Sequence, residues 1–300
     1  LFENTQDNLR RLGIASGFDF LGSPSGFDII QTLIPYSASS SYGQVFWVAL
    51  LNTLLVALLG VIQATLLGFV IGVARLSKNW LIAKLALLYI EIFRNIPLLL
   101  QIFFWYFAVL RAMPAPRQSL SLGDAIFLNI RGLYLPAPEF KTGFGWVLAA
   151  LAVALGLIFA IARWARRRQM ATGQPFPMLA TALALLLGLP LLAFVLAGAP
   201  LHWQLPELRG FNFQGGWVVI PEMASLLLAL TVYTAAFIAE IVRAGIQAVS
   251  HGQTEASFSL GLNTGLTLRL IILPQALRVI IPPLTNQYLN LTKNSSLAAA

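Results

Sequence analysis

Long apolar runs constrain the fold of this chain more than any other feature of its sequence. Of its 300 residues, 58% are hydrophobic and 10% are charged, whereas soluble domains carry about 25% charged residues. Several segments approach or exceed the roughly 17 to 25 residues that an α-helix needs to cross about 30 Å of hydrocarbon. We therefore predict an all-α, polytopic membrane protein. The predicted spans are 45–74, 85–110, 146–162, 178–197, 223–242 and 276–292.

The basic residues predict the side of the membrane on which each loop lies. Most of them fall in or beside the loops after the first, third and fifth spans, and these loops share one side. By the positive-inside rule that side is cytoplasmic, and both ends of the chain lie outside. The net charge of +8 is thus explained by topology, and nucleic acid is not a predicted partner. The cytoplasmic basic residues are Arg75, Lys78, Lys84, Arg163, Arg166, Arg167, Arg168, Arg243, Arg269 and Arg278.

Polar segments divide the chain into regions. The two outside loops are rich in Pro, Gly and aromatic residues and are long enough for local structure or a docking role. The run RWARRRQMATGQPFP, 163–177, predicts a cytoplasmic hairpin that anchors the topology and touches anionic lipid. The predicted regions are an outside segment at 1–44, two spans at 45–110, an outside loop at 111–145, two spans at 146–197, an outside loop at 198–221, and a core at 222–300.

The first span carries small residues at every fourth position. Gly60, Ala64, Gly68 and Gly72 fall on one helix face, which favours close approach of another helix. Because glycine is common in membrane helices, the spacing alone leaves open the alternative that this face has no packing role.

The stretch QTEASFSLGLNTGLTLRLIILPQALR, 253–278, interrupts the apolar sequence on the cytoplasmic side. Ser250 and Gln253 fit a capping box that begins a short helix, and Gly261 stands where that helix is expected to stop. Asn263 is placed to cap a second, amphipathic helix, which Pro274 is expected to end. We predict a helix-turn-helix that lies against the cytoplasmic face.

The spacing in this loop resembles the EAA loop of ABC importer permeases. Glu255-Ala256-Ser257 is followed by Gly261 six residues after the Glu, and then by Ile271, Leu273 and Pro274; Ser257 replaces the usual second Ala. In that family the loop is a coupling helix that sits in a groove of the ATPase subunit. The resemblance implies that ATPase coupling involves Glu255, Ala256, Ser257, Gly261, Leu273 and Pro274.

Two further stretches extend the resemblance. YIEIFRNIPLLLQIFFWYF from Tyr89 and YTAAFIAEIVRAGIQAV from Tyr233 are similar to the polar amino-acid subfamily of these permeases. The additional spans and outside loops are similar to the general L-amino-acid permeases of bacteria, which take glutamate, glutamine, aspartate and asparagine. In that subset, one span precedes the outside segment and at least one follows the present C-terminus, so we expect both true ends to be missing.

The resemblance also implies the fold and the partners. It implies the transmembrane domain fold of a type I ABC importer in the bacterial inner membrane. The implied partners are a homologous second permease, an ABC ATPase dimer, which uses ATP and Mg, and a periplasmic amino-acid-binding protein. This chain itself is expected to bind no cofactor.

A polar stripe on the last span predicts a transport pathway. Asn286, Asn290, Lys293 and Asn294 share one helix face, and such groups are expected to face a partner helix or a watery cavity. Lys293 either holds a substrate carboxylate or extends toward the outer headgroups.

Glu91 and Arg94 are three residues apart on the second span. We expect them to pair with each other or with other buried polar groups, either in the pathway or as a structural ion pair.

The sequence argues against several functions of this chain alone. It has no Cys and therefore no thiolate nucleophile or Cys-built zinc site. The two His residues, His202 and His251, fall on opposite sides of the membrane, so no metal site is predicted. No Gly-Lys pair occurs, so the phosphate-binding P-loop is missing. No catalytic residue is predicted; an intramembrane enzyme is disfavoured, whereas an ion-coupled secondary transporter stays open as an alternative.

Overall fold

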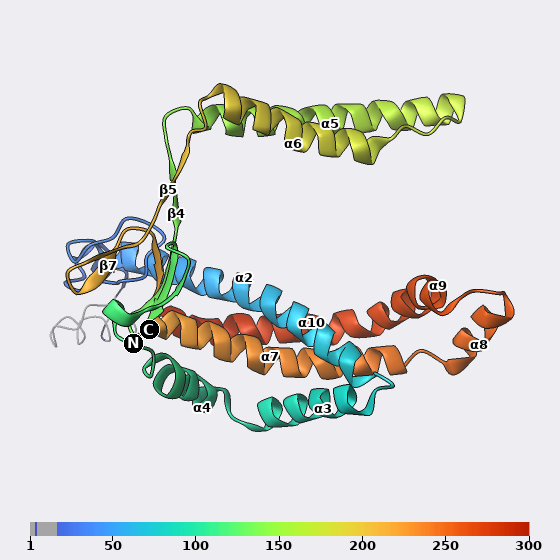
Figure 1. The fold of residues 1–300 in the computed structure, drawn as a ribbon, viewed down its shortest axis with the longest axis horizontal. Helices are drawn as coiled ribbons and strands as arrows, with labels where there is room; N and C mark the ends of the chain where they lie inside the picture. Colours follow the sequence, from blue (N-terminus) through green and yellow to red (C-terminus); the bar gives the residue numbers. More distant parts are fainter. Residues whose placement is uncertain (1–3, 5–16, 300) are drawn as a thin grey trace. The chain divides into compact units, whose positions relative to one another are not determined.

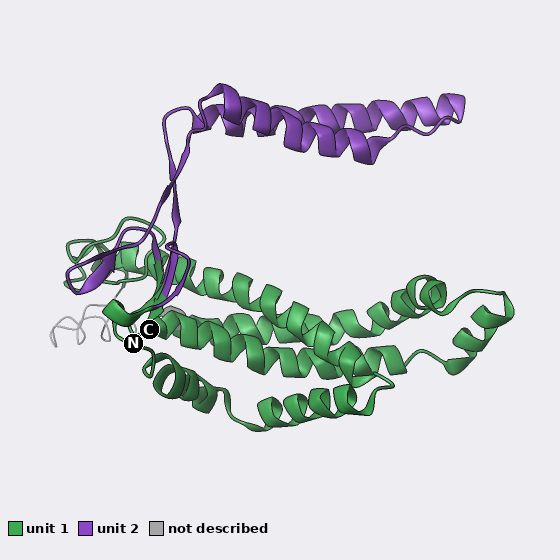
Figure 2. Ribbon diagram, viewed as in Figure 1, with its two compact units in different colours: residues 1–119, 128–133, 218–300 green, residues 120–127, 134–217 purple. Residues whose placement is uncertain are grey.

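The computed structural model describes residue 4 and residues 17–299. The chain divides into two compact units (Figure 2): unit 1 comprises residues 1–119, 128–133 and 218–300, and unit 2 comprises residues 120–127 and 134–217. Within the described residues, five helices are long and apolar enough to cross a membrane, and a bent pair of helices supplies a sixth candidate. The predicted polytopic helical architecture is confirmed.

Three long helices form the centre of unit 1. α2 (Tyr42–Arg75), α7 (Pro221–Gln247) and α10 (Leu273–Ser295) run side by side (Figure 1). In the most apolar 18-residue stretch of α7, 61% of the residues are buried, against 28% in that of α2. The helices of unit 1 therefore pack around α7. Their shared core is made of small and branched apolar side chains. It includes Ala57, Ala64, Ala235, Ile238, Val242, Ala276, Ile280 and Leu291.

The small-residue face of α2 packs against α7 and α10. A Cβ atom added at Gly68 would lie 2.6 Å from the Cβ of Ile238, and one added at Gly72 would lie 2.7 Å from the carbonyl oxygen of Ala239. Gly60 faces Leu291 of α10 in the same way, at 3.2 Å from its Cδ2. The predicted close-packing face is confirmed, and it is occupied within this chain.

The segment predicted as the second span is broken. α3 (Trp80–Asn95) is followed by α4 (Leu98–Phe103) and the π-helix η2 (Phe104–Leu110), and the pair is bent by 106°. Pro97 disfavours helical geometry at the residue before it, which explains the position of the break. Gln101 is 3% exposed, and its Nε2 donates to the carbonyl oxygens of Phe93 and Ile96 at 3.0 and 2.9 Å. That amide, which belongs to α4, therefore binds the backbone at the end of α3 across the break.

Residues 17–41, which were predicted to lie outside, have little regular structure. They contain the 3₁₀ turn η1 (Asp19–Gly22) and end at Ser41, whose side chain accepts a hydrogen bond from the backbone of Gln44 and caps α2. Farther along, η3 (Pro116–Gln118) is a 3₁₀ turn in the outside loop, and η5 (Ser296–Ala299) follows α10. The predicted outside segment also includes residues 1–3 and 5–16, which are not among the described residues.

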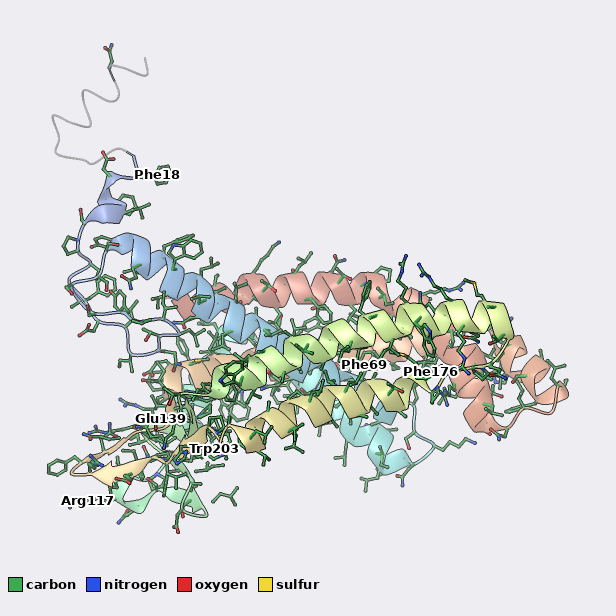
Figure 3. The ribbon with its side chains drawn as sticks, turned by 90° about the horizontal axis from the view of Figure 1, so that it is seen from above. Phe18, Phe69, Arg117, Glu139, Phe176 and Trp203 are labelled. Carbon is green, nitrogen blue, oxygen red and sulfur yellow. The ribbon has the colours of Figure 1, made fainter. Side chains whose placement is uncertain are left out.

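Unit 2 contains a helical hairpin and paired strands. α5 (Phe144–Thr172) and α6 (Met178–Leu196) pack against each other. β4 (Ala137–Phe140) pairs antiparallel with β5 (Leu201–Gln204), with Phe140 opposite Leu201, and β6 (Glu207–Arg209) pairs with β7 (Asn212–Gln214). Figure 3 labels Glu139 and Trp203 on the first of these ladders. The other strands form one sheet in the order β1 (Leu120–Leu122), β2 (Ile126–Asn129), β3 (Gly132–Leu135) and β8 (Trp217–Val219).

These strands bear out the prediction that the long outside loops hold local structure. Two aromatic contacts support the strands of unit 2: Phe127 stacks on Phe213 with ring centroids 4.5 Å apart, and Tyr134 lies 5.1 Å from the same ring. The sequence did not predict the strands, because each has only three or four residues and so gives too short a period-two pattern to detect.

Candidate functional site

The patterned loop that was predicted to be cytoplasmic folds as two short helices that lead into α10. α8 (His251–Ser259) begins after Ser250, as predicted. The capping box itself is not formed: the Ser250 side chain caps no backbone amide, and the Gln253 side chain instead accepts a hydrogen bond from Nε2 of Gln275 at 3.2 Å. The helix start was predicted correctly, but Gln253 contacts α10 in place of its own helix end.

Gly261 ends α8 as predicted. Its φ is +76°, its N–H donates to the carbonyl of Phe258 at 2.9 Å, and the N–H of Leu262 donates to the carbonyl of Ser257 at 3.1 Å. These two bonds form the Schellman motif, in which a left-handed residue satisfies the last carbonyls of a helix. An L side chain is strained in this conformation, which explains why glycine stands here.

The second helix begins as predicted but does not end where predicted. The Asn263 side chain accepts from the backbone N–H of Leu266 at 2.9 Å and caps α9 (Thr264–Thr267). The π-helix η4 (Leu268–Ile272) and α10 then follow without interruption. The expectation that Pro274 ends the helix is wrong, because the π-turn lies immediately before it and proline needs no backbone donor in the first turn of α10.

Ser257 joins the two arms of the loop. It is 2% exposed, and its Oγ lies 2.9 Å from Oγ1 of Thr267, which is also 2% exposed. The same hydroxyl donates to the carbonyl of Thr254 at 2.7 Å. This buried hydrogen bond holds α8 against α9.

The opposite face of α8 is exposed. Glu255 and Ala256 are exposed, and Phe258 and Leu260 are 48% and 80% exposed. The nitrogen Nδ1 of His251 lies 3.5 Å from Oε1 of Glu255, on a fully solvated face. The loop therefore presents a small surface with one carboxylate and two apolar side chains. Leu273 lies at the start of α10 and is 39% exposed.

A polar cavity lies between α7 and α10. Its volume is about 310 Å³, at the lower end of the range of about 300–1,000 Å³ found for small-molecule sites. It brings together three of the predicted pathway residues, Asn290, Lys293 and Asn294. Its full lining is Tyr233, Thr234, Phe237, Gln287, Asn290, Leu291, Lys293 and Asn294.

Two parts of this cavity were missed by the sequence reasoning. The polar stripe continues through Gln287, three residues before Asn290, and Asn286 is not among the lining residues. The facing wall of Tyr233, Thr234 and Phe237 gave a weak signal because aromatic and hydroxyl side chains are ordinary in membrane helices. The i, i+3, i+7 spacing of Gln287, Asn290 and Asn294 was the pattern that could have identified the correct face.

Glu91 and Arg94 do not form the expected ion pair among the described residues. Both are exposed on α3. Oε2 of Glu91 accepts a hydrogen bond from Nδ2 of Asn95 at 3.3 Å, and the guanidinium carbon of Arg94 lies 5.2 Å from the ring centroid of Phe237. Phe237 also lines the cavity, so Arg94 contacts a residue of the cavity wall. Glu91 is not among the lining residues.

An ion pair lies near the C-terminal end of α7. Nε of Arg243 donates to Oε2 of Glu240 at 2.9 Å, and Nη2 of Arg243 contacts Oε1. The guanidinium and the carboxylate thus meet through two parallel contacts, which is the geometry that gives arginine its strongest carboxylate bonds. Along the chain, this pair lies between the cavity residues of α7 and the start of α8.

Comparison with known proteins places the chain in a family. Residues 170–300 match the family described as the binding-protein-dependent transport system inner membrane component. The amino-acid ABC transporter permease protein YhdX of Escherichia coli is 59% identical over 300 residues, which cover 100% of this chain and 76% of the relative.

Two other relatives agree. The general L-amino acid transport system permease protein AapQ of Rhizobium johnstonii is 56% identical, over 99% of this chain and 74% of the relative. The glutamate/glutamine/aspartate/asparagine transport system permease protein BztB of Rhodobacter capsulatus is 44% identical, over 100% of this chain and 77% of the relative. The chain therefore belongs to the permease subunits of amino-acid ABC transporters and has the polytopic helical fold of a type I importer.

Proposed function

We propose that this chain forms one half of an ATP-driven pathway that takes up polar L-amino acids of the glutamate, glutamine, aspartate and asparagine class. The observation that carries this proposal is the polar cavity between α7 and α10. The names of AapQ and BztB, which share this whole sequence region, support the substrate class. The membrane in question is the bacterial inner membrane.

The chemistry of the cavity suits an amino acid. Three side-chain amides, from Gln287, Asn290 and Asn294, offer both donors and acceptors, and Lys293 supplies an ammonium group. A free amino acid carries a carboxylate and an ammonium group, so it needs donors and acceptors together. Such contacts are stronger in a space partly walled by two helices than in open water.

The route from ATP to the cavity runs through one helix. An apolar helical segment extends from Thr264 to Ser295, so the coupling loop at one end and Asn290 and Lys293 near the other belong to a single element. We propose that an ABC ATPase dimer holds α8 and moves this element, as a rigid body, against a homologous second permease. ATP and Mg are used by the ATPase, and a periplasmic binding protein delivers the substrate.

Reconstitution tests this function. The complex purified from its native membrane is placed in liposomes with the binding protein, and uptake of labelled glutamate, glutamine, aspartate and asparagine is measured with and without ATP. We expect co-purification of a P-loop ATPase and of a second permease, and uptake that needs ATP and survives an ionophore. Uptake that proceeds without any ATPase and collapses with the ion gradient would instead identify a secondary transporter.

The charge of Lys293 provides a second test. We expect Lys293→Glu to lower the uptake of glutamate and aspartate at least tenfold, because a carboxylate in the cavity repels a second carboxylate. Asparagine and glutamine uptake should fall less. Lys293→Arg, which keeps the charge, and Lys141→Glu, which changes an exposed lysine of the outside loop, are the controls. Equal uptake of all four substrates by Lys293→Glu and wild type would show that Lys293 serves the lipid interface instead.

A further inference from the structure

The cytoplasmic end of α5 carries a dense group of arginines. Arg163, Arg166, Arg167 and Arg168 lie within two turns of the helix, and all four are exposed. Arg163, Arg166 and Arg167 have the i, i+3, i+4 spacing that places side chains on one helix face. Ala165, in the same turn, is only 8% exposed, so the helix side that packs inward is a different one.

No carboxylate neutralises this group. The sequence contains no Asp or Glu from residue 140 to residue 206, and within the described residues none of the four arginines forms an ion pair. Arg168 has neutral partners: its guanidinium lies 5.4 Å from the ring centroid of Trp164, and Nη2 donates to Oε1 of Gln174 at 3.2 Å. Arg163, Arg166 and Arg167 are therefore an uncompensated cationic face.

Aromatic side chains mark the depth of this face in the membrane. Trp164 is 51% exposed and packs edge-on against Phe176, with ring centroids 5.4 Å apart. Figure 3 labels Phe176 in the segment that joins α5 to α6. Tryptophan prefers the boundary between hydrocarbon and headgroups, so the arginines beside it lie at the level of the lipid phosphates.

Apart from their contact with each other, α5 and α6 are largely left uncovered by the described residues. α5 buries only Ala154 and Ala165, and α6 buries no residue. In the most apolar 18-residue stretches of α5 and α6, 6% and 0% of the residues are buried. Both helices nevertheless have the length and hydropathy of membrane spans. The molecules that meet the arginine face in a membrane are therefore lipid headgroups.

We propose that Arg163, Arg166 and Arg167, beside Trp164, form a binding site for the phosphate groups of anionic phospholipids in the cytoplasmic leaflet. Guanidinium groups bind phosphate oxygens through paired N–H donors, which a lysine cannot reproduce. Each basic residue near an anionic surface strengthens association by about fivefold. A face of three arginines without acidic neighbours thus selects anionic over zwitterionic lipid.

Native mass spectrometry of the purified complex in mild detergent tests this site. The probes are phosphatidylglycerol, phosphatidylethanolamine of matched acyl chains, and inorganic phosphate. Arg166→Gln/Arg167→Gln is compared with Lys78→Gln/Lys84→Gln, which removes the same charge from two exposed lysines on the same predicted side. We expect the arginine variant to retain at least fivefold less phosphatidylglycerol than wild type, and the lysine variant to retain nearly all of it.

Two further measurements keep the result interpretable. Since the chain has no Cys, a single Met170→Cys at an 84% exposed position reports by maleimide labelling whether α5 keeps its orientation in each variant. Arg166→Lys/Arg167→Lys keeps the charge and is expected to bind phosphatidylglycerol more weakly than wild type. Equal phosphatidylglycerol retention by the arginine and lysine double variants, or displacement of the lipid by millimolar inorganic phosphate, would overturn the proposal.

Discussion

Replacing Gly261 by valine is expected to lower ATP-driven uptake at least tenfold while the chain stays inserted in the membrane. The φ of +76° costs an L residue roughly 1–2 kcal/mol, and a β-branched residue is especially disfavoured there. No atom lies within 4 Å of a Cβ built at Gly261, so the strain arises from the backbone alone. The measurement is uptake by reconstituted complexes, together with recovery of the ATPase in a pull-down.

The chain offers matched controls for this substitution. Gly252 lies in the first turn of α8, the helix that Gly261 ends, and it has no positive φ. A Cβ added at Gly252 would contact nothing closer than the Ser250 hydroxyl at 3.7 Å. We therefore expect Gly261→Ala to impair uptake and Gly252→Ala to leave it near wild type, although the two variants add the same methyl group. Gly261→Asn should retain most activity because asparagine tolerates the left-handed region. Normal ATP-driven uptake by Gly261→Val would count against coupling through this loop.

Gly68→Val is expected to prevent α2 from packing on α7. The added Cβ would lie 2.6 Å from the Cβ of Ile238 and 2.9 Å from the carbonyl oxygen of Ala235. The second of these is a backbone atom in the most buried helix, so relief requires the two helices to separate. Overpacking of a filled core costs about 1–3 kcal/mol. We expect a marked loss of monodisperse protein and a fall of several degrees in the unfolding temperature in detergent.

The control for Gly68→Val is the same change at helix positions with open space around the added side chain. Gly156 in α5 and Gly188 in α6 have no atom within 4 Å of an added Cβ. Gly156→Val and Gly188→Val should therefore insert and purify like wild type. If Gly68→Val were as stable as these two variants, the close contact between α2 and α7 would not be part of the folded subunit.

Much of the helical architecture was predictable because hydrocarbon imposes a length and a polarity on each span. The ends of elements were less predictable. α5 continues to Thr172, ten residues past the predicted end at 162, because arginine is a good helix former and Gly173, with φ +72°, stops the helix only where the charged run is over. The proline at position 97 could have predicted the break between α3 and α4. No residue pattern predicted the π-helix Leu268–Ile272 before Pro274.

The candidate site divides in the same way. Asn290, Lys293 and Asn294 were predictable because amides and an ammonium group are costly in lipid and are drawn to a shared cavity. Gln287 was missed because the sequence pattern alone did not fix which helix face turns inward, and that face is set by the contact of α10 with α7. The partners of Glu91 and Arg94 depended on tertiary packing, since Arg94 lies over the Phe237 ring of α7. Spacing along one helix could not show it.

The ladder between β4 and β5 has a consequence for the hairpin of α5 and α6. Because Phe140 stands opposite Leu201, the strand that enters the α5–α6 hairpin and the strand that leaves it are adjacent neighbours in a sheet. The hairpin therefore begins and ends at this two-stranded ladder, and without it a short turn could join β4 to β5. The junction beyond Phe140 and Leu201 is thus a position at which sequence can be inserted without opening the ladder.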